Sequence, residues 1–493
     1  MGRIQVQMIP EQEHWSSDTG FVLAAIGSAV GIGNIWRFSA VVGQNGGGAY
    51  LIPYLIAVCA FAMPLMILEL AMGRHFQGTV VSAFRAVRSR FATVGWLLCA
   101  IIFLVLCYYL VIAGWTAAYA LFSISGDTVA FTDFTGGMLP IVFFLITAAI
   151  TAAVISKGIQ KGIERLSTIL IPVSVGVLVI LALYSATLPG FSEGVSFLFT
   201  PDFSVLSDPL IWGAAFGQAF FSLSVGTGIL LTYGSYMERE MHIPRSALVI
   251  TLADLFVAFL AGMVIFPLVF TFGLTPAAGA ELAFSTLPMA FAAMPGGAFF
   301  AVAFFLVLFF AALTSSVSML EVSVSSLQES TGWTRMRTTL LLGSVMVAIG
   351  LPSALSYSSL NLTFNGIKVL DFMDETVGTL GLPIAGVLLA VAFTWFLPRE
   401  VLSKEIGPSL SRIVYPLCRY VIPLVLLVTT GARLVAGFDL VDLRLLPGSR
   451  WIGTLMQVEG MAAILIIAVL VIILLCRFGR CPLGRRMRKN KGE

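Results

Sequence analysis

Apolar runs of about 20 residues follow one another along most of this chain, and they constrain its fold more than any other feature. The chain of 493 residues is 58% hydrophobic and 11% charged, with a mean hydropathy of +0.99. A lipid bilayer offers no hydrogen-bond partners to the backbone, so each run predicts a membrane-spanning helix. The sequence therefore predicts an all-α polytopic membrane protein with twelve spans, at about 18–42, 49–73, 93–124, 138–156, 163–186, 209–237, 244–273, 297–328, 338–357, 368–397, 411–436 and 452–476.

The loop charges predict the orientation of these spans. Lys and Arg are frequent in the loops after even-numbered spans, whereas the loops 125–137, 187–208 and 274–296 contain none. Cytoplasmic loops retain positive charge, so both termini are expected in the cytoplasm and the protein in the cell membrane. The basic tail 477–493 is then a solvated membrane-surface anchor, and no nucleic-acid partner is expected.

Two spans are interrupted by glycine at corresponding positions. The stretch "GSAVGIGNIWRF" (27–38) falls in the first span, and "FFSLSVGTGILLTYGSY" (220–236) falls in the sixth. Paired interruptions of this kind indicate an inverted repeat with a binding site near the middle of the membrane. The prediction is a 5+5 repeat over 15–186 and 209–397, preceded by a tail over 1–14 and followed by peripheral helices over 398–476. A glycine face for helix packing remains the alternative reading of Gly27 and Gly31.

Polar groups inside the spans favour a site over simple packing. Asn34 and Arg37 follow the first interruption, and packing requires neither. The other charged residues within spans are Glu69, Asp254, Glu321, Asp371 and Asp374. Glu69 is a candidate to cap the amides of a broken helix, and Glu321 could equally bond a neighbouring backbone.

The stretch "AALTSS" (311–316) offers oxygen ligands on one helix face. The Thr314 and Ser315 hydroxyls and the Ala311 carbonyl suit an alkali cation, although such hydroxyls commonly bond their own helix instead. The histidines are His14, His75 and His242, all outside the spans, and no phosphate-binding loop or dinucleotide fingerprint occurs. We therefore do not expect an enzyme or an ATP-driven pump.

Several long motifs in order, including "WSSDTGFVLAAIGSAVGIGNIWRF", "FFSLSVGTG" and "AALTSS", resemble the neurotransmitter:sodium symporter family. The resemblance is to its prokaryotic amino-acid-transporting branch, which has the leucine-transporter fold, and it extends from about Trp15 to Phe396. It implies two sodium sites and one substrate site. Sodium site 1 would use Ala29, Asn34, Ser222 and Asp254, and sodium site 2 would use Gly27, Val30, Ala311, Thr314 and Ser315. The substrate would contact Ser28, Ile32, Gly33, Val105, Tyr109, Phe221, Ser222, Ser224, Thr227, Ser315 and Met319.

The resemblance also implies a gate at each end of the site. Arg37 and Asp374 would close the outside as an ion pair, with Phe221 as a lid and Gln218 nearby. The inner gate would use Trp15, Ser235, Tyr236 and Glu329. The arginine that relatives often carry three residues before Trp15 is Gln12 here, so Arg3 is a candidate substitute.

Two further departures from the family bear on function. Asp254 stands where many relatives have Asn, and Ala258 stands where chloride-dependent members have Ser. A fixed carboxylate would replace the chloride charge, which predicts chloride independence. Monoamine carriers have an Asp where this chain has Gly31, so the substrate should supply its own carboxylate.

The sequence thus predicts a sodium symporter that imports a neutral, largely apolar amino acid by alternating access, with sodium, substrate and lipid as partners. Two alternatives stay open. One is a proton-coupled antiporter that uses Asp254 or Glu69, and the other is a non-transporting receptor.

Overall fold

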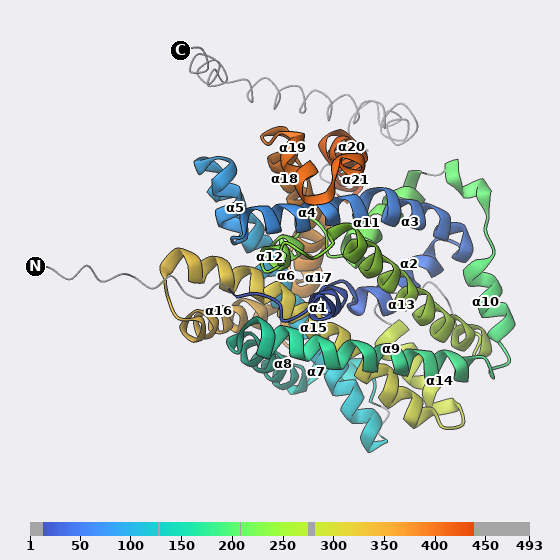
Figure 1. Ribbon diagram of the computed structural model, residues 1–493. Coiled ribbons are helices and arrows are strands. Elements are labelled where there is room, and N and C mark those ends of the chain that lie inside the picture. The colour runs from blue at the N-terminus through green and yellow to red at the C-terminus, as the bar shows by residue number, and fades with distance from the viewer. Residues whose placement is uncertain (1–12, 127–128, 208, 275–281, 438–493) are drawn as a thin grey trace, which may run out of the picture.

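The computed structural model is almost entirely helical, and it describes residues 13–126, 129–207, 209–274 and 282–437 (Figure 1). Its α-helices are α1 (Asp18–Ala29), α2 (Phe38–Gln44), α3 (Leu51–Ala57), α4 (Met63–Phe76), α5 (Val80–Val87), α6 (Ala92–Ser125), α7 (Phe131–Gly136), α8 (Leu139–Ser156), α9 (Arg165–Ser185), α10 (Phe191–Phe199), α11 (Pro209–Ser222), α12 (Ile229–Ser235), α13 (Ile243–Thr271), α14 (Leu287–Ala293), α15 (Gly297–Thr331), α16 (Arg335–Leu355), α17 (Val369–Met373), α18 (Leu382–Trp395), α19 (Arg399–Ile406), α20 (Pro408–Pro416) and α21 (Ile422–Gly437).

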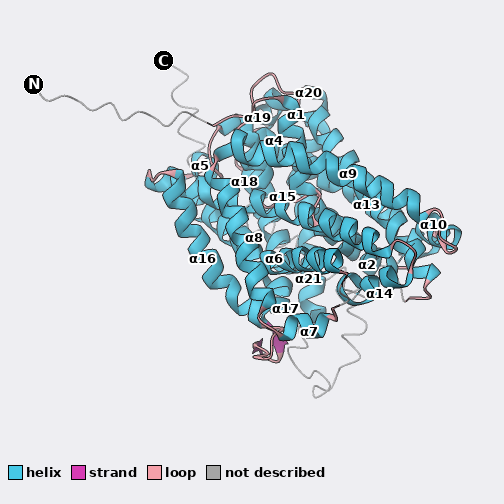
Figure 2. Cartoon of the chain, turned by 90° about the horizontal axis from the view of Figure 1, so that it is seen from below, coloured by secondary structure: helices cyan, strands magenta, loops and turns pink. Residues whose placement is uncertain are grey.

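Shorter elements join and extend these helices. The 3₁₀ and π turns are η1 (Gly33–Arg37), η2 (Gly47–Tyr50), η3 (Val58–Ala62), η4 (Ser89–Phe91), η5 (Ile159–Glu164), η6 (Phe203–Ser207), η7 (Leu282–Thr286), η8 (Asp374–Gly381) and η9 (Leu417–Val421). Strands β1 (Thr363–Phe364) and β2 (Ile367–Lys368) form a small antiparallel hairpin. The hairpin lies at one edge of the molecule beside α17 (Figure 2).

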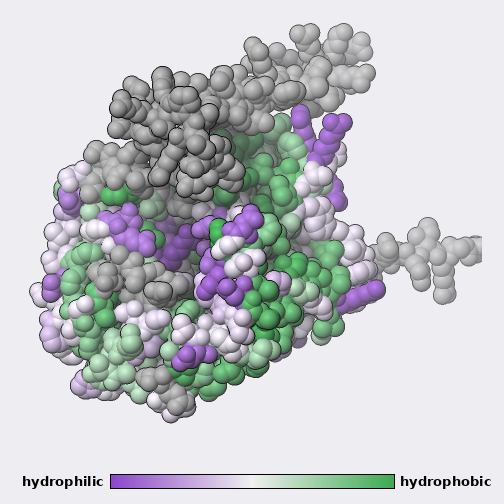
Figure 3. Space-filling model, turned by 180° about the vertical axis from the view of Figure 1, so that it is seen from behind, coloured by the Kyte–Doolittle hydropathy of each residue, from purple (hydrophilic) through white to green (hydrophobic). Residues whose placement is uncertain are grey.

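Within the described residues, nine helices are long and apolar enough to cross a membrane, or ten if a bent pair counts as one span. They agree with the predicted spans to within a few residues at most ends. The predicted sixth span is present as two short helices, α11 and α12. The predicted twelfth span, 452–476, lies outside the described residues. Many apolar side chains on the outer surface are exposed, including Ile180, Leu183 and Leu252, and hydrophobic side chains spread over much of one face (Figure 3). Such a surface suits a lipid environment.

Both glycine-containing stretches interrupt their helices. Helix α1 ends at Ala29 and η1 begins at Gly33, with a bend of 56° between the two segments. Helix α11 ends at Ser222 and α12 begins at Ile229. Gly226 and Gly228 both have a positive φ, of 81° and 82°, which residues with a side chain rarely adopt. The second interruption therefore depends directly on these two glycines.

The interrupted helices lie in the middle of the molecule. Helix α1 packs against α9, α13 and α15, and α12 packs against α4 and α15. Helices α6 and α15, the two longest, pack along each other, and α15 also packs against both α1 and α12. The backbones of α4 and α12 approach closely through Gly73 and Gly234.

We expect Gly234→Ala to lower the free energy of unfolding by about 1–3 kcal/mol, the usual cost of overpacking. The added carbon would lie 2.6 Å from the Leu70 carbonyl oxygen. Thermal unfolding of the detergent-purified protein measures the change. Gly176→Ala on α9 is the matched control, because nothing lies within 4 Å of its added carbon. An unchanged midpoint for Gly234→Ala would contradict the close α4–α12 contact.

Candidate functional site

The first break frees backbone groups that side chains from the same span and from other helices contact. The Asn34 side chain accepts a hydrogen bond from the Gly31 amide at 3.0 Å, and the Tyr109 hydroxyl accepts one from the Ile32 amide at 3.3 Å. On the carbonyl side, Ser224 donates to the Ser28 carbonyl at 2.9 Å, and Gln218 donates to the Gly33 carbonyl at 3.0 Å. The break is therefore a set of buried polar backbone groups, several of which are satisfied by distant parts of the chain.

The second break is held by a buried carboxylate. Glu69 on α4 accepts a hydrogen bond from the Gly226 amide, and its side chain is fully buried. Thr227 donates to the Ser224 carbonyl at 2.7 Å and accepts from the Ile229 amide at 3.3 Å. Glu69, predicted as a support residue, thus lies against the amide side of the second break.

Asn34, Ser222 and Asp254 form a buried cluster where the two breaks meet. The Asn34 amide group donates to Ser222 at 2.7 Å and to the Asp254 carboxylate. The Ser222 hydroxyl lies 3.0 and 2.9 Å from the two carboxylate oxygens of Asp254. All three side chains are at most 1% exposed. The Asp254 charge thus has hydrogen-bond donors but no ion-pair partner among the described residues, which is costly unless a cation joins it.

Helix α15 brings the second predicted set of oxygens to α1. The Ser315 hydroxyl lies 3.4 Å from both the Gly27 and Ser28 carbonyl oxygens, and the Thr314 hydroxyl lies 3.1 Å from the Ala311 carbonyl oxygen. A methyl carbon added at Gly27 would lie 3.2 Å from Cβ of Thr314, so the two helices meet at this glycine. The Thr314 hydroxyl bonds its own helix, the alternative that the sequence left open. The donor set consists only of neutral oxygens, which suits an alkali cation.

A small cavity lies between the breaks. Its volume is about 30 Å³, and its lining includes every predicted substrate contact except Ile32 and Ser222. The structure adds Ala29, Gly31, Asn34, Ile102, Phe220, Ile229 and Leu382 to this lining. Sequence reasoning missed Ile102 and Leu382 because apolar residues of long helices give no signal of which side faces a cavity.

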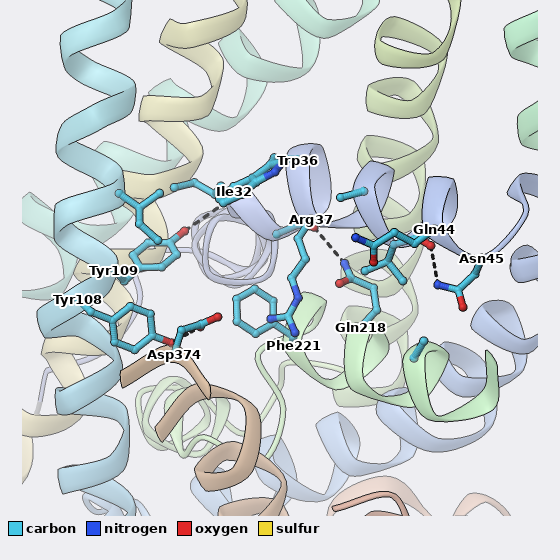
Figure 4. A pocket seen from close by; sticks show the side chains of 15 residues that line it. Ile32, Trp36, Arg37, Gln44, Asn45, Tyr108, Tyr109, Gln218, Phe221 and Asp374 are labelled. Carbon is cyan, nitrogen blue, oxygen red and sulfur yellow. Dashed lines mark hydrogen bonds between the residues drawn. The ribbon is translucent and has the colours of Figure 1, made fainter. Parts of the chain in front are cut away.

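A larger cavity of about 360 Å³, which we call the vestibule, lies on the other side of Phe221 (Figure 4). Arg37, Gln218 and Asp374 line it. The guanidinium carbon of Arg37 lies 4.3 Å from the centroid of the Phe221 ring, and Asp374 accepts a hydrogen bond from Tyr108 at 2.8 Å. The predicted Arg37–Asp374 ion pair is not formed in this structure. In Figure 4, the Phe221 ring stands between the two side chains.

The opposite end of the site is closed by Trp15. Its indole N–H donates to the Tyr233 carbonyl at 3.0 Å, and its amide donates to the Tyr236 carbonyl at 3.3 Å. The predicted gate residue Ser235 instead bonds back to Thr232 within α12. The predicted gate residue Glu329 accepts a hydrogen bond from the Thr79 amide at the start of α5. Gln12 and Arg3 lie outside the described residues.

An ion-pair network that the sequence analysis did not predict lies beside Trp15. Arg335 pairs with Glu321 and, at 3.2 Å, with Glu13. Glu321 also accepts from the Tyr236 hydroxyl at 2.8 Å, and Glu13 accepts from the Ile159 amide at 2.7 Å. Glu321 thus has a charged partner, whereas the sequence left open both a functional role and a bond to a neighbouring backbone. A carboxylate within a predicted span, as at Glu321, indicated that a buried partner was needed. The sequence did not identify that partner.

Comparisons with known proteins identify the family. The model of the sodium:neurotransmitter symporter family matches residues 12–134 and 134–478. An uncharacterized sodium-dependent transporter, YhdH, of Bacillus subtilis is 35% identical over 84% of this chain and 96% of its own length. The sodium-dependent neutral amino acid transporter B(0)AT2 of Mus musculus is 25% identical over 52% of this chain and 40% of its own length.

A solved structure supports the same assignment. The crystal structure of MhsT in complex with L-phenylalanine is 36% identical, covers 85% of this chain and 99% of its own, and superposes with a TM-score of 0.79. A match of this quality shows a shared fold as well as common ancestry. With the family model spanning most of its length, the chain belongs to the sodium:neurotransmitter symporter family, a family of sodium-dependent membrane transporters.

Proposed function

We propose that this protein is a sodium-coupled symporter that imports a neutral amino acid by alternating access. The meeting of two broken helices around buried oxygens, amides and a small cavity carries the proposal. Freed carbonyls bind a cation, and freed amides at the amino end of a half-helix bind a carboxylate. MhsT was solved with L-phenylalanine and B(0)AT2 is named for neutral amino acids, which supports this substrate class.

The topology that goes with this function has twelve spans in the cell membrane and both termini in the cytoplasm. Helices over 15–186 and 209–397 would form the two inverted halves of a 5+5 repeat. Residues 398–476 would be peripheral and 477–493 a basic cytoplasmic tail. The matching positions of the breaks, in the first and sixth spans, support the repeat. The vestibule then faces outward and Trp15 faces the cytoplasm.

Two sodium ions are the proposed coupling ions. The first would bind the Ala29 carbonyl and the side chains of Asn34, Ser222 and Asp254. The cation would balance the buried Asp254 carboxylate, which has hydrogen-bond donors from Asn34 and Ser222. The second would bind the Gly27, Val30 and Ala311 carbonyls with the Thr314 and Ser315 hydroxyls. Proximity of α1 and α15 at Gly27 supports the second site. Because Asp254 supplies a fixed negative charge, transport should not require chloride.

The substrate would bind with its carboxylate at the Ile32 and Gly33 amides and the Tyr109 hydroxyl. Gly31 leaves no room for an acidic side chain that could hold an amine. A carbon added there would lie 2.9 Å from the Ser315 hydroxyl oxygen and 3.1 Å from the Tyr109 oxygen. An amino acid, which carries its own negative charge, therefore fits better than a monoamine.

Alternating access would use the two ends differently. Formation of the Arg37–Asp374 pair above Phe221 would close the outside after the substrate enters. Release of the substrate into the cytoplasm would require Trp15 to break its hydrogen bonds with Tyr233 and Tyr236. It would also require the ion pairs of Arg335 with Glu13 and Glu321 to separate. The closed Trp15 end and the vestibule at the other end support an outward-facing arrangement of these residues.

The energetics allow strong accumulation. Each sodium ion releases about 2.3 kcal/mol across about 100 mV and about 1.4 kcal/mol for a tenfold gradient. Two coupled ions would then sustain accumulation of roughly 10⁵-fold, and one ion a few hundredfold.

Ligand-dependent thermal stability tests the proposed function. The purified protein is heated with a panel of amino acids, in sodium and separately in potassium. Ligands that bind only the folded state raise the unfolding midpoint. We expect a rise with neutral amino acids in sodium alone. Amino-acid stabilisation that depends on pH and not on sodium would favour the proton-coupled alternative, and no stabilisation by any amino acid would overturn the proposal.

Replacement of Asp254 tests the first sodium site and chloride independence. A unit charge about 4 Å away contributes roughly 4 kcal/mol at an effective dielectric constant of about 20, before desolvation. We expect Asp254→Asn to weaken apparent sodium affinity by at least about tenfold. Substrate-linked sodium titrations with gluconate in place of chloride measure the effect.

The control is Asp133→Asn on the exposed side of α7, which should leave sodium affinity unchanged. The wild-type titration should be the same in chloride and gluconate. A wild-type protein that loses sodium-dependent binding in gluconate would contradict the chloride-independent site.

Loss of Arg335 tests the closed cytoplasmic end. Arg335→Gln leaves the buried Glu321 carboxylate without its charged partner, so we expect a loss of about 3 kcal/mol or more in unfolding free energy. Glu321→Gln combined with Arg335→Gln removes both charges and should recover part of that loss. Denaturation of the single and double variants provides the comparison. Equal losses in both variants would mean that the pair does not act as a unit.

A further inference from the structure

The Ser28 hydroxyl is an unusual polar group in the cavity between the two breaks. Ser28 is 1% exposed and lines the cavity. Its oxygen has no hydrogen-bond partner among the residues that the structure describes. A buried hydroxyl without a hydrogen-bond partner costs free energy. We therefore expect the Ser28 hydroxyl to gain a partner when a ligand occupies the cavity.

The other polar side chains of the cavity already have partners within the protein. Ser224 donates to the Ser28 carbonyl, and Thr227 bonds the Ser224 carbonyl and the Ile229 amide. Asn34 bonds Gly31, Ser222 and Asp254. Tyr109 accepts from the Ile32 amide, and Ser315 contacts the carbonyls of α1. Ser28 is the exception in this set.

Serine hydroxyls in helices normally bond a carbonyl one turn earlier. Ser39 bonds Ile35 at 2.9 Å and Ser316 bonds Ala312 at 2.8 Å, and both are buried. Ser28 lies in the last turn of α1 and does not make such a bond. Its hydroxyl therefore remains available to whatever occupies the cavity.

The substrate carboxylate has proposed partners of its own at Ile32, Gly33 and Tyr109, so the Ser28 hydroxyl is available to another part of the substrate. Much of the remaining lining is apolar, and it includes Ile102, Val105, Phe220, Met319 and Leu382. The other polar side chains of this lining already have partners, so among the described lining residues Ser28 alone offers an unused hydrogen-bonding group.

We propose that the transported amino acid has a neutral side chain with a hydrogen-bonding group, which the Ser28 hydroxyl engages. The proposal rests on the symporter function proposed above and narrows its substrate class from apolar to amphipathic side chains. Hydroxyl-bearing amino acids such as tyrosine or threonine belong to this class. Ser28 is then a specificity residue, because an apolar substrate would leave its hydroxyl buried without a partner.

Near-isosteric pairs of amino acids test this assignment in the full-length protein. Dissociation constants for tyrosine against phenylalanine, and for threonine against valine, are measured in sodium with wild type and Ser28→Ala. A site that hydrogen-bonds a substrate group discriminates against an analogue that lacks this group. We therefore expect the dissociation constant of the polar amino acid, divided by that of its apolar counterpart, to rise at least about fivefold in Ser28→Ala for one pair or both. Ser39→Ala is the matched control, since Ser39 bonds its own helix outside the cavity.

The comparison also separates failure of this inference from failure of the symporter. Sodium-dependent binding of phenylalanine or valine by Ser28→Ala shows that the variant is folded and that the site works. If both ratios then equal those of wild type, the Ser28 assignment is overturned and the symporter stands. Absence of binding by all four amino acids to wild type in sodium would overturn the Ser28 assignment, and absence of stabilisation by every amino acid of the thermal-stability panel would overturn the symporter as well.

Discussion

Backbone groups freed at the two helix breaks must be satisfied within the protein, because a bilayer supplies no partners for them. The rest of the site depends on this constraint. Glu69 holds the Gly226 amide, Gln218 holds the Gly33 carbonyl, and Asn34 holds the Gly31 amide. Each of these side chains is fully or almost fully buried. The free-energy cost of interrupting the two helices is therefore offset by hydrogen bonds from specific side chains.

The same constraint accounts for the proposed coupling of ion and substrate. The cluster of Asn34, Ser222 and Asp254 joins the first break to the second and to α13. A cation placed at Asp254 would lie close to the amides that would receive the substrate carboxylate. Each would then lower the electrostatic cost of burying the other. Phe221 lies between this region and the vestibule, so access from that side requires its movement.

Local features were predictable from the sequence, whereas long-range pairing was not. Glycine spacing and apolar runs predicted both breaks and most helix ends, because these follow from local backbone chemistry. The Asn34, Ser222 and Asp254 contact followed only from a family resemblance, since the three residues lie far apart in the chain. Arg335 follows an even-numbered span, where the loop pattern explains a positive charge without any partner, so its pairing with Glu13 and Glu321 needed the tertiary structure. The Arg37–Phe221 contact, in place of an Arg37–Asp374 pair, depends on how the helices are arranged around the vestibule.

Uptake into sealed proteoliposomes tests sodium coupling most directly. The purified protein is reconstituted with potassium inside, and a labelled neutral amino acid is added outside together with sodium. The account predicts accumulation above the outside concentration that collapses when sodium is equilibrated across the membrane. Accumulation that follows an imposed pH gradient and ignores sodium would contradict it. Sodium-dependent binding with no flux across the membrane would also contradict it, and would indicate a receptor.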